Sequence, residues 1–124
     1  MQIKKNLNGA FTLVEIMIVV AIIGLLAAIA IPNFVRARES AQLNSIANNL
    51  RILEGAKEQW ALETKQSTTA SVGGLATLTD YLKNNTIVAV VGETYTPGTV
   101  SDLIQATGSG PLAGKSPPFT ITSF

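Results

Sequence analysis

The feature that most constrains this chain is a long stretch without charge near its N-terminus. No charged residue occurs between Ile16 and Val35, and the segment Phe11–Ile31 is apolar apart from Thr12 and Glu15. An α-helix rises about 1.5 Å per residue, so roughly 20 apolar residues cross a bilayer core of about 30 Å. A soluble protein of only 124 residues would rarely bury an uncharged helix of this length. We therefore predict a transmembrane helix over residues 11–32.

The composition excludes several classes of function. Charged residues make up 14% of the chain, against about 25% in typical soluble proteins. The net charge of +1 provides no concentrated basic face, so no nucleic-acid partner is expected. The chain has no His and no Cys, which excludes thiol catalysis, disulfides and a Ser–His pair. Its eight acidic residues are spread along the sequence, so we expect no catalytic residues, no metal and no cofactor.

The segment 33–66 changes character and is predicted to be an amphipathic helix. Apolar residues recur there at spacings near three and four, namely at Leu43, Ile46, Leu50, Leu53 and Trp60. Four charged residues lie mostly off that stripe: Arg51, Glu54, Lys57 and Glu58. One face of the helix should therefore be buried. Because no strong breaker lies between Pro32 and Gly73, we expect one continuous helix from about Thr12 to Lys65.

Gly24 and Pro32 are the candidate positions for local flexibility in this helix. Pro32 lacks a backbone donor and should kink or loosen the helix. Both residue types are also tolerated in membrane helices, so two interpretations stay open. The positions are either inert, or they let the segment give up helical hydrogen bonds when its surroundings change.

Residues 67–124 form a small head that is rich in Thr, Gly and Ser. The pattern predicts a short helix opened by a capping box at Thr77–Asp80 and a β-hairpin that pairs Thr86–Val91 with Thr94–Thr96. A last strand is predicted over Phe119–Phe124. A head this small and without disulfides has too little apolar material for a core of its own. We expect its antiparallel sheet to pack on the 33–66 helix, which gives an α+β fold.

Residues 1–10 have the character of a short basic leader, with Lys4 and Lys5 ahead of the small residues Gly9 and Ala10. A secretory signal peptide loses its apolar region on cleavage, whereas a cut after Ala10 would leave the apolar helix as the new N-terminus. Glu15 would then lie close to the new amino group of Phe11. Glu15 is either an acid that reaches the membrane interface or the partner of the Phe11 amine of another copy.

The segment Phe11–Phe34, FTLVEIMIVVAIIGLLAAIAIPNF, resembles the N-terminal signature of type IV prepilins and type II secretion pseudopilins. The basic leader, Glu15 as the fifth residue counted from Phe11, and Pro32 at the helix kink all fit that signature. The resemblance implies a type IV pilin-like fold, removal of residues 1–10 by prepilin peptidase and N-methylation of Phe11. It also implies that Glu15 and Phe11 act together in assembly, and that residues 11–32 form the core of a filament.

The sequence departs from the family pattern in three places. Many type IV pilins have a C-terminal disulfide loop, which a chain without Cys cannot form. The family usually has Gly directly before the Phe, whereas Ala10 stands there and Gly9 is displaced by one. Major pseudopilins usually carry acidic Ca²⁺ ligands in their C-terminal segment. The acids after Glu63 are here only Asp80, Glu93 and Asp102, and they are scattered.

The function that the resemblance implies is that of a structural filament subunit. The precursor would be a single-pass inner-membrane protein with its head outside the cytoplasm, and the product a periplasmic or cell-surface filament. Expected partners are further copies, other pilin-like subunits, prepilin peptidase and the inner-membrane assembly machinery. Two alternatives stay open: a pseudopilin of a type II secretion system, and a membrane-anchored binding domain that does not polymerise. A small membrane-bound hydrolase is disfavoured, because the chain lacks His and its acids are dispersed.

Overall fold

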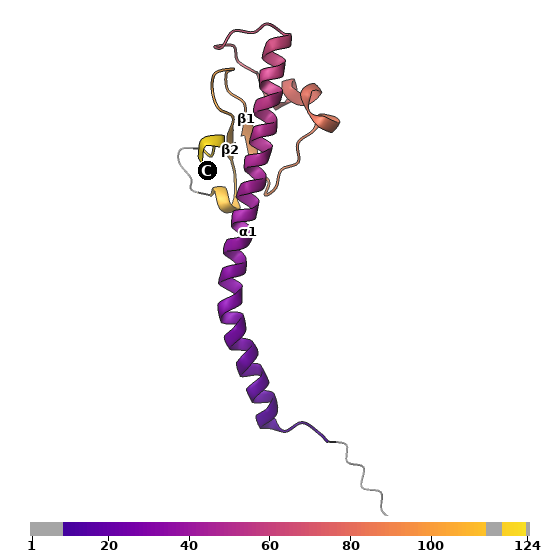
Figure 1. Ribbon diagram of the computed structural model, residues 1–124, viewed down its shortest axis with the longest axis vertical. Helices are drawn as coiled ribbons and strands as arrows, with labels where there is room; N and C mark the ends of the chain where they lie inside the picture. The colour runs from indigo at the N-terminus through magenta and orange to yellow at the C-terminus, as the bar shows by residue number, and fades with distance from the viewer. Residues whose placement is uncertain (1–8, 114–117, 124) are drawn as a thin grey trace, which may run out of the picture. The chain divides into compact units, whose positions relative to one another are not determined.

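The computed structural model describes residues 9–113 and 118–123, and its dominant element is one long helix (Figure 1). Helix α1 spans Leu13–Glu63 and includes Pro32 in its interior. Within the described residues, α1 is the helix that is long and apolar enough to cross a membrane. By its internal contacts the chain divides into two compact units, Met1–Arg36 and Ala37–Phe124.

The end of α1 is fixed by backbone hydrogen bonds that the sequence did not signal. The N–H of Gln66 donates to the carbonyl of Ala61 over 3.0 Å, and that of Lys65 donates to Leu62 over 3.4 Å. This pair of bonds is the Schellman arrangement, which requires a left-handed residue and usually selects Gly. Lys65 takes that conformation here, with φ of 54°. The helix therefore stops at Glu63 although no Gly marks its end.

The head contains a small antiparallel sheet of two strands, β1 (Thr94–Thr96) and β2 (Gln105–Thr107). Tyr95 pairs with Ala106 at the centre of the sheet, and both side chains are buried. Ala106 also exchanges backbone hydrogen bonds of 2.8 and 3.2 Å with Phe119. The expected antiparallel head is thus confirmed, although its strands are very short.

Two predicted strands are wrong. Residues 86–91, all of them described, form no strand, and β1 pairs with β2 instead. The reason is local, because the N–H groups of Val90 and Val91 bind the carboxylate of Glu93 and are not available to a strand. The predicted last strand reduces to the single bridge at Phe119, after which Ile121–Ser123 forms a 3₁₀ turn. Phe124 lies outside the described residues.

The other short elements are 3₁₀ helices. They are η1 (Leu75–Tyr81), η2 (Lys83–Asn85) and η3 (Gly110–Leu112). The predicted capping box at Thr77–Asp80 is wrong, since η1 begins at Leu75 and has no side-chain cap. Asn84 and Asn85 both have positive φ, which ends this run as Asn residues often do.

The core of the head forms where the sheet and the 3₁₀ helices cover one face of α1. The helix contributes Ile46, Leu50, Leu53 and Ala56. The rest of the chain contributes Val72, Leu78, Leu82, Tyr95, Ile104, Ala106, Leu112 and Phe119. Leu43, Trp60 and Tyr81 pack at its edge and are partly buried. The predicted apolar stripe is therefore confirmed, with one exception: Lys57, expected on the solvent side, is 1% exposed.

A buried carboxylate organises the segment before β1. Glu93 accepts hydrogen bonds from the N–H of Val90 and of Val91 at 2.8–2.9 Å, and a further one from the Tyr95 hydroxyl. Asn49 of α1 donates to the Tyr95 oxygen over 2.9 Å and to the carbonyl of Val88 over 3.0 Å. This network ties residues 88–95 to α1 through polar contacts.

The network also sets the ionisation of its members. Burial favours the neutral form of Glu93, but the hydrogen bonds from Tyr95, Val91 and Val90 outweigh it, so the pKa of Glu93 lies below its usual value. Burial and the bond to Glu93 raise the pKa of Tyr95 far above its usual range. The phenol therefore stays protonated and keeps donating to the carboxylate.

We expect Leu53→Ala to lower the free energy of unfolding of the head by about 2–5 kcal/mol, because Leu53 is 0% exposed. The matched variant Ile52→Ala changes the neighbouring residue, which is 46% exposed, and should cost less than about 1 kcal/mol. Denaturant unfolding of the full chain in detergent micelles, followed by Trp60 fluorescence, measures both. Equal losses would show that the stripe through Leu53 is not the core.

We expect the stability of the head to fall in acid through protonation of Glu93. A carboxyl with a lowered folded-state pKa contributes stability above its unfolded pKa of about 4.3 and loses it as the pH falls through the folded value. Unfolding of wild type and Glu93→Gln should therefore be compared from pH 7 to below pH 4. The wild type should lose more stability than the variant over that range. Glu58→Gln, at an exposed acid on α1, is the control and should follow the wild type.

Candidate processing and assembly site

The predicted cleavage site lies in exposed chain just before the helix. Gly9, Ala10, Phe11 and Thr12 adopt no regular structure, and all four are exposed. A Cβ added at Gly9 would meet no atom within 4 Å. The peptide bond between Ala10 and Phe11 is therefore free of secondary-structure hydrogen bonds.

Glu15 caps its own helix. The N–H of Thr12 donates to Oε2 of Glu15 over 2.7 Å, and the N–H of Glu15 donates to Oγ1 of Thr12 over 3.3 Å. These reciprocal bonds form a capping box, which satisfies two of the free donors at a helix start. The carboxylate also lies at the positive end of the helix dipole. The sequence signal for this cap is the Thr-x-x-Glu pattern at Thr12–Glu15.

The cap leaves part of Glu15 available. Only Oε2 takes part in the capping box, and Oε1 has no hydrogen-bond partner among residues 9–113 and 118–123. Glu15 is exposed and Phe11 is 82% exposed. The structure thus joins Thr12 and Glu15 at the start of α1, directly after the exposed Phe11, and within the described ranges Oε1 of Glu15 accepts no hydrogen bond.

Gly24 and Pro32 lie in the interior of α1, and the helix continues through both positions. A Cβ added at Gly24 would contact no other part of the chain within 4 Å. No close packing therefore requires Gly at this position in the isolated subunit. Their role in helix flexibility stays a prediction.

The described residues outside this site present no group of acids that could hold a metal. No cluster of three or more Asp and Glu residues forms in ranges 9–113 and 118–123. Asp80, Glu93 and Asp102 each bind groups of the head itself: Asn85 contacts Asp80, Tyr95 contacts Glu93 and Thr99 contacts Asp102.

Known proteins are similar to this chain, some mainly in its N-terminal half and others over most of its length. Residues 5–31 match the prokaryotic N-terminal methylation motif. The type IV major pilin protein PilA of Myxococcus xanthus is 48% identical over 56 residues, which cover 45% of this chain and 26% of PilA. The type II secretion system core protein G of Klebsiella pneumoniae is 36% identical over 63 residues, which cover 51% of this chain and 45% of that protein.

A third relative matches over most of the sequence. The fimbrial protein EcpC of Eikenella corrodens is 31% identical over 106 residues, which cover 84% of this chain and 67% of EcpC. The chain spans between about a quarter and two thirds of the length of these relatives. No solved structure matches the chain significantly. With its methylation motif, long N-terminal helix and small antiparallel head, the chain belongs to the family of type IV prepilins and type II secretion pseudopilins.

Proposed function

We propose that the chain is a structural subunit of a type IV pilus-like filament, processed by prepilin peptidase and polymerised through α1. The observation that supports the proposal is the junction at Phe11, where an exposed segment without regular structure leads directly into an apolar helix. Cleavage at this point retains the helix and places Glu15 beside a new amino group. A secretory signal would instead be lost together with its apolar part.

The apolar half of α1 explains why such a subunit needs either lipid or other copies. Its large side chains are exposed throughout the N-terminal unit, among them Leu13, Ile16, Val20, Leu26 and Ile31. Apolar surface in water costs about 25 cal/mol per Å². A bilayer removes this cost before assembly, and neighbouring helices remove it in a filament. Head-to-tail contacts that do not close into a ring extend into an open helical polymer.

The precursor is proposed to lie in the bacterial inner membrane, with the head outside the cytoplasm, and to move from there into a periplasmic or cell-surface filament. The proposed partners are identical or similar pilin-like subunits, prepilin peptidase and the inner-membrane assembly machinery. The family membership and the apolar segment of α1 support this placement. The orientation follows from the family, because basic residues flank both ends of the apolar segment.

A pseudopilin of a type II secretion system is the second candidate. The similarity to core protein G of Klebsiella pneumoniae, at 36% identity over 63 residues, supports it. Both candidates use the same processing and assembly chemistry. A membrane-anchored binding domain that does not polymerise is the third interpretation, and the assembly experiment below separates it from the other two.

We expect the mature chain to begin at Phe11 and to carry one methyl group on its amino nitrogen. Intact-mass measurement of the membrane-extracted protein tests this directly. A chain that begins at Ala10, or that retains residues 1–10, would contradict the proposal. The matched variant Ala10→Gly restores the residue that the family usually has before Phe, and it should be cut at the same bond at an equal or higher rate.

We expect Glu15→Ala to insert into the membrane normally but to enter filaments poorly. In a filament the Phe11 ammonium of a neighbour would be buried without its partner, which typically costs about 3–5 kcal/mol. The measurement is the ratio of pelletable filament to membrane-bound subunit for wild type and variant. Equal ratios would show that Glu15 does not pair with an amine during assembly. If the wild type itself forms no filament, the non-polymerising domain is the better interpretation.

The variant Thr12→Val separates the capping role of Glu15 from its pairing role. It removes the hydroxyl that binds the N–H of Glu15 but keeps the carboxylate. If pairing with an amine matters, this variant should assemble far better than Glu15→Ala. If Glu15 acts only as a cap, Glu15→Gln, which keeps an oxygen for the N–H of Thr12 and loses the charge, should assemble about as well as the wild type.

A further inference from the structure

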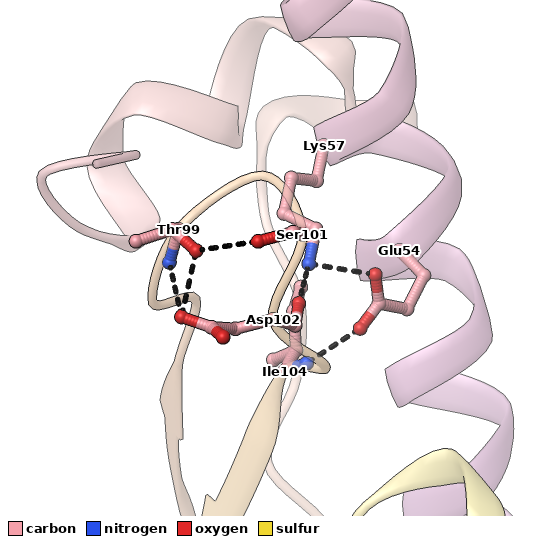
Figure 2. Close-up of polar contacts among 6 residues, drawn as sticks. All are labelled: Glu54, Lys57, Thr99, Ser101, Asp102 and Ile104. Atoms are coloured by element: carbon pink, nitrogen blue, oxygen red, sulfur yellow. Dashed lines mark hydrogen bonds and ion pairs between the residues drawn. The ribbon is translucent and has the colours of Figure 1, made fainter. Parts of the chain in front are cut away.

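Lys57 is a cation buried inside the head. It lies on α1, its side chain is 1% exposed, and it points into the space between the helix and the β1–β2 loop (Figure 2). A buried charge is costly unless it is paired and hydrogen-bonded. An alkylammonium group has three donors and no acceptor, so it requires surrounding oxygen atoms.

The oxygens around Lys57 come from two different parts of the chain. Oε2 of Glu54, one turn earlier on α1, lies 2.8 Å from the Lys57 nitrogen. The backbone carbonyl of Asp102, in the β1–β2 loop, accepts a further hydrogen bond from that nitrogen. The second carboxylate oxygen of Glu54 accepts the N–H of Ile104. The Glu54–Lys57 pair on α1 therefore holds the loop at two points. Lys57 binds the carbonyl of Asp102, and Glu54 binds the N–H of Ile104.

The loop is shaped so that its carbonyl faces the helix. The carboxylate of Asp102 binds the N–H of Thr99 over 3.1 Å and the Thr99 hydroxyl over 2.7 Å, which closes a turn (Figure 2). These bonds from Thr99 hold the pKa of Asp102 below its usual value, so the turn is maintained at neutral pH. Gly98 has φ of 68°, and a Cβ there would lie 3.2 Å from Cβ of Asp102. The side chain of Asp102 thus binds Thr99 within the loop, while its backbone carbonyl oxygen accepts the hydrogen bond from Lys57.

We propose that the Lys57 ammonium is a built-in cation that fastens the β1–β2 loop to α1, so that the head needs no divalent cation to order this loop. The oxygens that a metal ion would use at this point are already occupied: Oε2 of Glu54 and the Asp102 carbonyl bind Lys57, and Oδ2 of Asp102 binds Thr99. A tethered ammonium cannot dissociate on dilution or be removed by a chelator. The consequence for assembly rests on the proposed function: filaments of this chain should form without added Ca²⁺.

The first test measures amide hydrogen exchange in the full chain extracted into detergent micelles. The exchange rate of the Ile104 N–H, which binds Glu54, reports whether the β1–β2 loop is held to α1. The N–H of Ala106, which binds Phe119, reports on the neighbouring sheet. Lys57→Met keeps the apolar stem and removes the charge, and it should speed exchange at Ile104 by about tenfold or more while Ala106 changes little. Lys83→Met, at an exposed Lys of the head, is the control and should change neither amide.

The second test restores the missing cation chemically. Lys57→Ala lacks a segment equivalent to n-propylammonium, so added n-propylammonium should slow exchange at Ile104 again. The neutral n-propanol should not. If Lys57→Ala does not accumulate, the comparison of Lys57→Met with wild type still decides the proposal. Because exchange is measured on the extracted subunit, a chain that never polymerises would contradict the proposed function and leave this test intact.

Each possible result of the exchange experiments either supports or overturns the proposal. The proposal holds if the wild-type Ile104 amide exchanges at the same rate in EGTA and in Ca²⁺, and if the charge at Lys57 protects it. It is overturned if Ca²⁺ slows exchange at Ile104 in the wild type, because a metal would then order the loop. It is also overturned if Lys57→Met leaves Ile104 protected, or if n-propanol works as well as n-propylammonium.

Discussion

The head depends on one packing interaction, the burial of the Ile46–Leu50–Leu53 face of α1 under the rest of the chain. The sheet has only three residues in each strand, and the 3₁₀ helices are short. Neither could bury enough apolar area to fold independently. The helix acts as the second layer that the sheet lacks. Any change that moves α1 in the head must therefore disturb the strands, because they share its core.

Where the head has no regular strand pairing, carboxylate side chains accept hydrogen bonds from the backbone N–H groups instead. Glu93 accepts hydrogen bonds from backbone N–H groups in the segment before β1, and Glu54 accepts one from the residue just before β2. Each of these carboxylates is itself anchored, the first to Tyr95 and the second to Lys57. Buried N–H groups have to be satisfied, and a carboxylate can accept several of them at once. This is why a head with so little sheet still holds its loops against the helix.

The sequence predicts best what depends on apolar periodicity. The uncharged segment lies within α1 as expected, and the stripe through Leu50 is buried in the head, because its spacing matches one face of a helix. Strand pairing in the head was predicted incorrectly, since β-branched residues at 86–91 suggest a strand whether or not their N–H groups have another partner. The buried position of Lys57 was also missed, because a charge beside the stripe normally faces water. Glu54 lies only one turn away, but the Asp102 carbonyl is a backbone group 45 residues along the chain, so no local pattern reveals that this pair is buried.

The start of α1 illustrates how one residue serves two states of the chain. In the uncut chain, Glu15 satisfies the N–H of Thr12 and stabilises the helix start. The proposed cut after Ala10 would convert the preceding peptide bond into an ammonium group at Phe11, only one residue before the cap. The N–H of Thr12 would survive this cut, so Oε2 can keep its bond, and Oε1 has no hydrogen-bond partner in the part of the chain that the structure describes. The capping box then holds the carboxylate in a fixed orientation at the helix end. If assembly pairs this acid with the ammonium of a neighbouring subunit, as proposed, the acid is already ordered, and less conformational entropy is lost on binding.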